Sequence, residues 1–206
     1  PTAVTLANAT ALLPENTSTS SALKVADIII NDDAIGINTI TLSGADTTAF
    51  ELIGTALFLK ADTTLDFETK NYYSLTLSVL DASIIDSSPI ATTFDLAIRN
   101  LNEAPTAVTL ANTLVSLLEN TSTSISSIKV ADIVITDDDL GTNTISLSGA
   151  DASTFELVDS AIYLKTDIAF DFETKNSYNL TVSVLDATID GSSPITASYN
   201  LCLLYT

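Results

Sequence analysis

The chain is a tandem duplication, and this feature limits its possible folds more than any other. Residues 1–13, PTAVTLANATALL, return as residues 105–117, PTAVTLANTLVSL, and residues 64–83 return as residues 169–188. A period this long is too long for a solenoid unit, because roughly 100 residues can enclose their own hydrophobic core. Each copy is therefore expected to form a whole domain.

The predicted domains are residues 1–103 and 104–206, and both have the pattern of a β-sandwich. Apolar and polar residues alternate in residues 74–79, SLTLSV, and in residues 179–184, NLTVSV, as they do in a strand with one buried face. No segment keeps apolar residues at helical spacing. About seven short strands in each copy predict an all-β chain of two tandem seven-stranded Greek-key sandwiches of immunoglobulin-like architecture.

Charge and composition exclude several classes of function. Asp and Glu outnumber Lys and Arg by 26 to 7, and the net charge of −19 argues against binding to nucleic acid or to an anionic membrane. No apolar run approaches the roughly 20 residues that span a bilayer, so no membrane insertion is expected. Histidine is absent and no nucleophile motif is present, so we expect no catalytic residues and no enzyme. The single cysteine, Cys202, is expected to be a small core residue. The chain is expected to be part of a longer protein, because it opens at Pro1 directly on the repeat.

The acidic residues concentrate in a few loops. Residues 137–143 read DDDLGTN, so Asp137, Asp139 and Asn143 can direct oxygens to one cation while Gly141 allows a tight turn. Ca²⁺ fits such a loop better than Mg²⁺ does, because it accepts more oxygens in irregular geometry. A solvated turn whose aspartates bond to backbone N–H groups explains the same residues, and both interpretations stay open at this point.

Further carboxylates recur at matching places in the two copies. The pairs are Glu15 and Glu119, Asp66 and Asp171, Glu68 and Glu173, and Asp81 and Asp186. Each one alone is explained as an exposed loop residue, but their order along the chain resembles that of a known family of domains.

Taken together, these motifs resemble the cadherin repeat, and most closely the bacterial cadherin-like modules of large secreted or surface proteins. The motifs are P-E-N at residues 14–16, D-F-E at 66–68, N-L-N-E-A-P at 100–105, D-D-D-L-G-T-N at 137–143 and V-L-D at 184–186. The resemblance covers both copies nearly from end to end. It implies Ca²⁺ at the joint between consecutive domains.

The resemblance also implies which residues bind the ion. The expected ligands are Glu15, Asp66 and Glu68 of the first copy, Asn100, Asn102 and Glu103 of the linker, and Asp137, Asp139, Asn143 and Asp186 of the second copy. Asn100 stands where the family usually has Asp, and Ala34 replaces the second Asp of the first copy's loop. The chain therefore contains one complete joint, between its own two copies.

The expected function is that of a calcium-binding structural and adhesive module of a bacterial extracellular protein, in which Ca²⁺ rigidifies the tandem array. The expected partners are adjacent repeats of the same protein, like chains, or a surface polysaccharide. Two alternatives remain open. One is a subunit that forms an extracellular fibre or surface layer by exchange of its apolar terminal strand, and the other is a carbohydrate-binding module.

Overall fold

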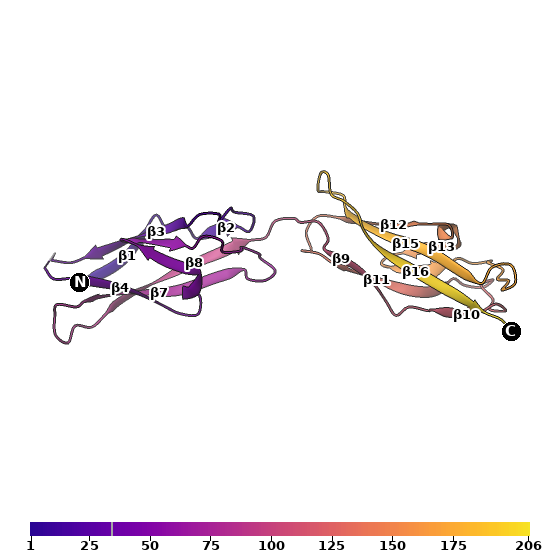
Figure 1. Ribbon diagram of the computed structural model, residues 1–206, viewed down its shortest axis with the longest axis horizontal. Helices are drawn as coiled ribbons and strands as arrows, with labels where there is room; N and C mark the ends of the chain where they lie inside the picture. Colours follow the sequence, from indigo (N-terminus) through magenta and orange to yellow (C-terminus); the bar gives the residue numbers. More distant parts are fainter. Residues whose placement is uncertain (34) are drawn as a thin grey trace. The chain divides into compact units, whose positions relative to one another are not determined.

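Short β-strands form nearly all of the regular secondary structure, as the alternation of apolar and polar residues predicts. A computed structural model describes residues 1–33 and 35–206, of which 50% lie in strands and 3% in helices. The described chain divides into two compact units, unit 1 from Pro1 to Leu101 and unit 2 from Asn102 to Thr206 (Figure 1).

Unit 1 is a sandwich of two four-stranded sheets. One sheet has the order β1-β3-β6-β5 and the other has the order β2-β8-β7-β4. The elements are β1 (Ala3–Ala7), β2 (Leu12–Pro14), β3 (Leu23–Asn31), β4 (Asn38–Ser43), the 3₁₀ helix η1 (Thr47–Ala49), β5 (Phe50–Ile53), β6 (Ala56–Leu59), β7 (Tyr72–Asp81) and β8 (Ile90–Arg99).

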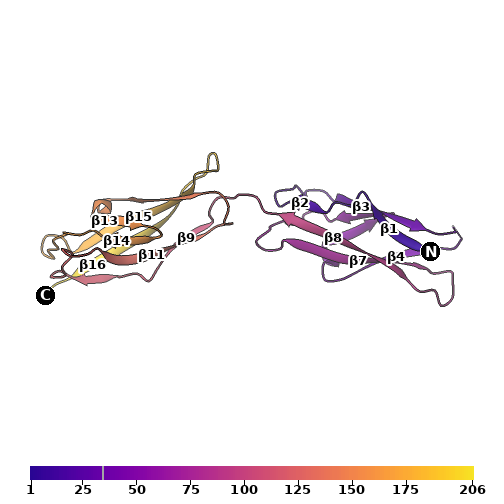
Figure 2. The same cartoon turned by 180° about the vertical axis from the view of Figure 1, so that it is seen from behind.

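Unit 2 repeats this architecture strand for strand. Its sheets have the orders β9-β11-β14-β13 and β10-β16-β15-β12, and β14 is labelled in Figure 2. The elements are β9 (Ala107–Ala111), β10 (Ser116–Leu118), β11 (Ile128–Thr136), β12 (Asn143–Ser148), the 3₁₀ helix η2 (Ala152–Thr154), β13 (Phe155–Val158), β14 (Ala161–Leu164), β15 (Ser177–Asp186) and β16 (Ile195–Leu204).

The predicted sandwich class is confirmed, but in the described residues each unit has eight strands where seven were predicted. One reason is that the first segment of each unit forms two strands, which are separated near Asn8 and near Asn112, each with a left-handed φ of 49°. Asparagine tolerates this conformation better than most residues. Before the break, β1 pairs antiparallel with β3; after it, β2 pairs parallel with β8 in the other sheet.

Each unit encloses a hydrophobic core between its sheets. In unit 1 the ring of Phe50 meets Tyr73 and Phe94 edge-on, with centroids 5.9 and 5.7 Å apart. In unit 2 Phe155 meets Tyr199, which replaces Phe94 and donates its hydroxyl hydrogen to the Leu114 carbonyl. The buried residues of each core come from that unit alone.

The last strand of the chain belongs to its own unit. β16 is hydrogen-bonded to β15 on one side and to β10 on the other. The fibre alternative needs this strand to pair with another chain, and the strand is not available at a sheet edge here. Cys202, which we expected in the core, is exposed on β16, because it lies opposite Ser116 and Ser177 on the outward face of the sheet.

The loops of each unit gather at two ends. We call one of them the leading end; there β1 begins beside the end of β3, and β9 begins beside the end of β11. The N–H groups of Thr2 and Thr106 donate to the carbonyls of Asn31 and Thr136 at this end. At the trailing end, the N–H of Glu15 donates to the carbonyl of Arg99, the last residue of β8. Among the residues that the structure describes, no helix is long and apolar enough to cross a membrane.

Candidate cation-binding sites

Three carboxylates of unit 1 meet at its trailing end. Glu15 follows β2, while Asp66 and Glu68 lie in the loop between β6 and β7. One oxygen from each carboxylate lies within 4.8 Å of the others. Like charges held this close repel one another unless a cation or protons neutralise them, so the cluster has the composition of a cation site.

Backbone hydrogen bonds fix the geometry of this cluster. Glu15 is 5% exposed, and its two oxygens accept the N–H groups of Phe67 and Leu101 at 2.8 and 2.6 Å. Glu15 therefore ties the β6–β7 loop to the segment in which the chain leaves unit 1. The backbone N–H and hydroxyl of Thr69 donate to Asp66 and lower the pKa of its carboxyl group, so Asp66 stays ionised at neutral pH.

Unit 2 carries the same cluster at its own trailing end. Glu119, Asp171 and Glu173 each place an oxygen within 4.8 Å of the other two. Glu119 accepts the N–H groups of Phe172 and Thr206 at 3.0 and 3.1 Å, and these bonds lower its pKa. The arrangement is thus a property of the repeat rather than of one copy.

The leading end of unit 2 gathers a second set of oxygens. Asn143, the first residue of β12, is directly opposite Asp186, the last residue of β15. The amide of Asn143 donates to one oxygen of Asp137, which precedes it in the β11–β12 loop. Strand pairing thus brings together residues that lie more than forty positions apart in the sequence.

Four oxygens of this set are buried and accept no hydrogen bond. They are Asn102 Oδ1, Asp137 Oδ1, Asn143 Oδ1 and Asp186 Oδ2. Asp186 as a residue is 0% exposed. Buried polar atoms in native proteins nearly always have a partner, and an ion or an ordered water is the usual one where the protein supplies none.

The backbone of Gly141 lies against this set. A Cβ atom at Gly141 would be 2.4 Å from Asp186 Oδ2 and 2.5 Å from Asn102 Oδ1. These two oxygens therefore converge on one side of the loop and lie no more than about 5 Å apart. Donation from the Thr188 hydroxyl lowers the pKa of Asp186, which keeps this buried carboxylate charged.

Seven of the ten predicted ligands fall into two groups, one in each unit. The structure brings together Glu15, Asp66 and Glu68 in unit 1, and Asn102, Asp137, Asn143 and Asp186 in unit 2. Asp139 is exposed on the loop with a left-handed φ of 62°. Glu103 contributes its backbone N–H to Asp138, and Asn100 follows the last residue of β8.

Two residues of the second group were missed by the sequence analysis. Asp138 accepts the N–H groups of Glu103 and Leu140 and so shapes the loop. Thr188 bonds to both Asn102 and Asp186. The signal for Thr188 was its place two residues after an aspartate, where a hydroxyl can reach back to the carboxylate.

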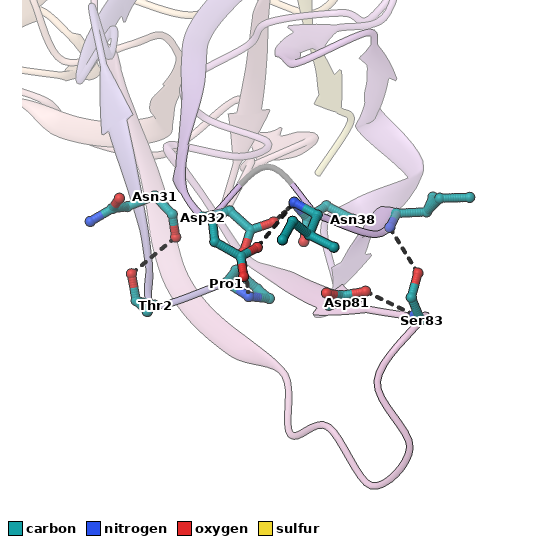
Figure 3. Close-up of polar contacts among 10 residues, drawn as sticks. Pro1, Thr2, Asn31, Asp32, Asn38, Asp81 and Ser83 are labelled. Atoms are coloured by element: carbon teal, nitrogen blue, oxygen red, sulfur yellow. Dashed lines mark hydrogen bonds and ion pairs between the residues drawn. The ribbon is translucent and has the colours of Figure 1, made fainter.

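The leading end of unit 1 keeps some contacts of unit 2 and differs in others (Figure 3). Asp32 accepts the Asn38 amide at 2.6 Å and lies 3.1 Å from the Pro1 nitrogen, and Asp81 accepts the N–H of Ser83. Ile37, which is 71% exposed, stands where unit 2 has Thr142. Ala34, which replaces the second Asp of this loop in the sequence, lies outside the described residues.

Comparison with known proteins agrees with the fold. No protein-family model matches the chain. Protocadherin Fat 4 of Mus musculus is 28% identical over 198 residues, which is 93% of the chain but 4% of the length of that protein.

Solved structures of protocadherin fragments have the same fold. Human mucin-like protocadherin EC1-2 matches with a TM-score of 0.67 and 18% identity over 100% of both chains. Human protocadherin-24 EC1-2 matches with a TM-score of 0.63 and 16% identity over 99% of both chains. PcdhgB3 EC1-4 gives a TM-score of 0.71 and 20% identity over 98% of this chain and 50% of that one.

Fold, motif order and these similarities agree on the class of the protein. Its two units have the fold of the tandem domains in these protocadherin structures.

Proposed function

We propose that the chain is a calcium-binding structural and adhesive module, with Ca²⁺ bound where unit 1 leads into unit 2. The observation that carries this proposal is the set of four buried, unpartnered oxygens at the leading end of unit 2. Two are carboxylate oxygens and two are amide oxygens, and such a set is suited to a hard cation that takes oxygen ligands. The carboxylate cluster of unit 1 supplies further oxygens of the same kind.

The composition of the ligand set favours Ca²⁺ over Mg²⁺. Ca²⁺ takes six to eight oxygens in flexible geometry, whereas Mg²⁺ demands a near-ideal octahedron and keeps several of its waters. Acidic and amide side chains from separate loops suit the larger ion. The proposed ligands are Glu15, Asp66, Glu68, Asn100, Asn102, Glu103, Asp137, Asp139, Asn143 and Asp186.

The proposed role of the ion is mechanical. Leu101 is tied to unit 1 through Glu15, and the next residue, Asn102, is tied to unit 2 through Thr188. An ion bound by ligands on both sides of this junction would restrict the few backbone dihedral angles that lie between Leu101 and Asn102. Calcium would also stabilise whichever folded segments hold it, since it binds the folded form.

The experiment is titration of the chelator-stripped protein with CaCl₂ in a calorimeter, together with its melting temperature. The proposal requires heat of binding and a rise in melting temperature with Ca²⁺, and a much weaker response to MgCl₂. Asp137→Asn should weaken binding. Asp159→Asn removes the same charge from an exposed turn and should bind as the wild type does. A wild-type protein that gives neither heat nor stabilisation contradicts the proposal.

The remaining expectations stay predictions. They are an extracellular location, a bacterial source, the lack of catalytic activity, and adhesion through adjacent repeats, like chains or a surface polysaccharide. For sugar binding, the rings of Tyr73, Tyr178 and Tyr199 are buried in the cores, whereas Tyr72 is 47% exposed on β7. The fold therefore gives no specific support to the carbohydrate alternative.

A further inference from the structure

We infer that Thr188 is a positioning residue of the proposed calcium site, and that its hydroxyl group directs the free oxygens of Asn102 and Asp186 toward the ion. This inference rests on the proposed function. The motifs that predicted the ligands give Thr188 no role, and it is supported here by its contacts alone.

The Thr188 side chain joins two of the proposed ligands. Its Oγ1 accepts a hydrogen from the Asn102 amide at 2.8 Å and donates its own hydrogen to Asp186 Oδ1 at 2.6 Å. The backbone N–H of Thr188 donates to the same Asp186 oxygen at 2.7 Å. Asp186 and Thr188 lie near the end of β15, whereas Asn102 is the first residue of unit 2.

These bonds decide which atoms remain for a cation. Asp186 Oδ1 is occupied by Thr188, so Oδ2 is the oxygen that stays buried without a partner. The Asn102 amide nitrogen is occupied in the same way, so Asn102 Oδ1 is the side-chain atom that stays without a partner. Both free oxygens lie within 2.5 Å of one point beside Gly141. One hydroxyl group thus sets the direction of a neutral ligand and of a charged ligand.

The matching residue of unit 1 does not have this role. Ser83 occupies the position of Thr188, but its Oγ accepts the backbone N–H of Ile37 at 3.0 Å. Its backbone N–H donates to Asp81 at 2.8 Å, as in unit 2. The backbone part of the contact is therefore common to both repeats, while the bridge between two side chains is particular to unit 2. Ser83 provides a control at the same place in the fold.

The test compares Thr188→Val, Thr188→Ser and Ser83→Ala by calorimetric titration with CaCl₂. Valine keeps the shape of threonine but removes the hydroxyl, and should weaken binding by roughly 10- to 100-fold, the usual effect of losing a partner of a metal ligand. Thr188→Ser keeps the hydroxyl and should restore the wild-type affinity. Ser83→Ala should bind as the wild type does.

A second measurement uses the cation-free protein. NMR relaxation of the Asn102 side-chain amide should show an ordered group in the wild type and in Thr188→Ser, and a mobile one in Thr188→Val. The melting temperature without calcium should be alike in the wild type and Thr188→Ser, and lower in Thr188→Val, which loses the side-chain bonds to Asn102 and Asp186.

The outcomes separate the two proposals. If the wild type binds Ca²⁺ and Thr188→Val binds it equally well, the inference about Thr188 is wrong and the proposed function stands. If Thr188→Ser fails to restore affinity, the hydroxyl is not the cause and the inference is also wrong. If the wild type binds no Ca²⁺, both the proposed function and the inference about Thr188 are wrong.

Discussion

At the scale of single residues, Gly141 determines whether the oxygens of unit 2 can converge. Its φ of +70° is one that side chains rarely adopt, and a Cβ there would lie 2.4 Å from Asp186 Oδ2. We expect Gly141→Ala to abolish calcium binding, because the methyl group pushes Asp186 and Asn102 apart. The left-handed backbone alone should cost roughly 1–2 kcal/mol of the free energy of unfolding.

A second glycine separates the effect of strain from that of steric clash. Gly191 has a φ of +76°, but a Cβ there would meet nothing within 4 Å. Gly191→Ala should therefore lose a similar amount of stability in urea unfolding and still bind Ca²⁺ with wild-type affinity. Equal calcium affinities for the two alanine variants would show that the space beside Gly141 is unimportant.

The ligands differ in how far the sequence could identify them. A short local spacing, which can be recognised in the sequence without a structure, joins Asp137, Gly141 and Asn143. The bond between Thr188 and Asn102 could not be found in this way, because the two residues are 86 positions apart and share no local motif. Asp138 looked like one carboxylate among three. Its bonds to backbone N–H groups show that it shapes the loop.

At the scale of elements, alternation of apolar and polar residues predicted the long strands well. β7 and β15 are buried at every second position, as their sequences indicate. The division of the first strand was missed, because the pattern of residues 1–14 does not show which sheet each half joins. The left-handed residues Asn8 and Asn112 allow the chain to pass from one sheet to the other. Local sequence gives only a weak signal for this conformation.

An ion pair holds η1 of unit 1 to the start of β7. Asp46 Oδ1 lies 2.7 Å from Lys70 Nζ, while Asp46 Oδ2 accepts the N–H of Ser74 at 2.8 Å. The hydrogen bond from Lys70 is the main cause of the lowered pKa of Asp46. We expect Asp46→Asn to reduce the stability of unit 1 by about 1 kcal/mol at pH 7, because an amide keeps the Ser74 contact but loses the charge.

The pH dependence of this effect has a definite sign. The folded-state pKa of Asp46 is lower than that of the unfolded chain, so the stabilisation is fully present above the unfolded value of about 3.9. It is lost as the pH falls through the folded value. Urea unfolding should thus show a difference between wild type and Asp46→Asn at pH 7 that disappears in strong acid. A difference that grew on acidification would contradict this account. Asp151→Asn, which breaks the matching pair with Lys175, should affect unit 2 in the same way.

At the scale of the whole molecule, the duplication gives two folds of the same kind with unlike leading ends. Each unit has its own core, so neither depends on the other for its buried residues. Unit 2 presents Thr142 and Asp190 where unit 1 presents Ile37 and Ile85, which are 71% and 90% exposed. We therefore expect Ca²⁺ to bind at the leading end of unit 2, where unit 1 leads into it, and not at the leading end of unit 1.

This asymmetry leads to a prediction for the full chain in solution. If Ca²⁺ joins ligands on both sides of the Leu101–Asn102 junction, adding it should narrow the range of arrangements that the two units sample. Small-angle scattering of the stripped protein should then change on addition of CaCl₂. Asp137→Asn should lose the change and Asp159→Asn should keep it, because only Asp137 belongs to the proposed site. Circular dichroism of both variants should match the wild type, since neither carboxylate lies in a core. A wild-type profile that is the same with and without Ca²⁺, in a protein that calorimetry shows to bind it, would mean that the ion is held by one unit alone and has no mechanical role.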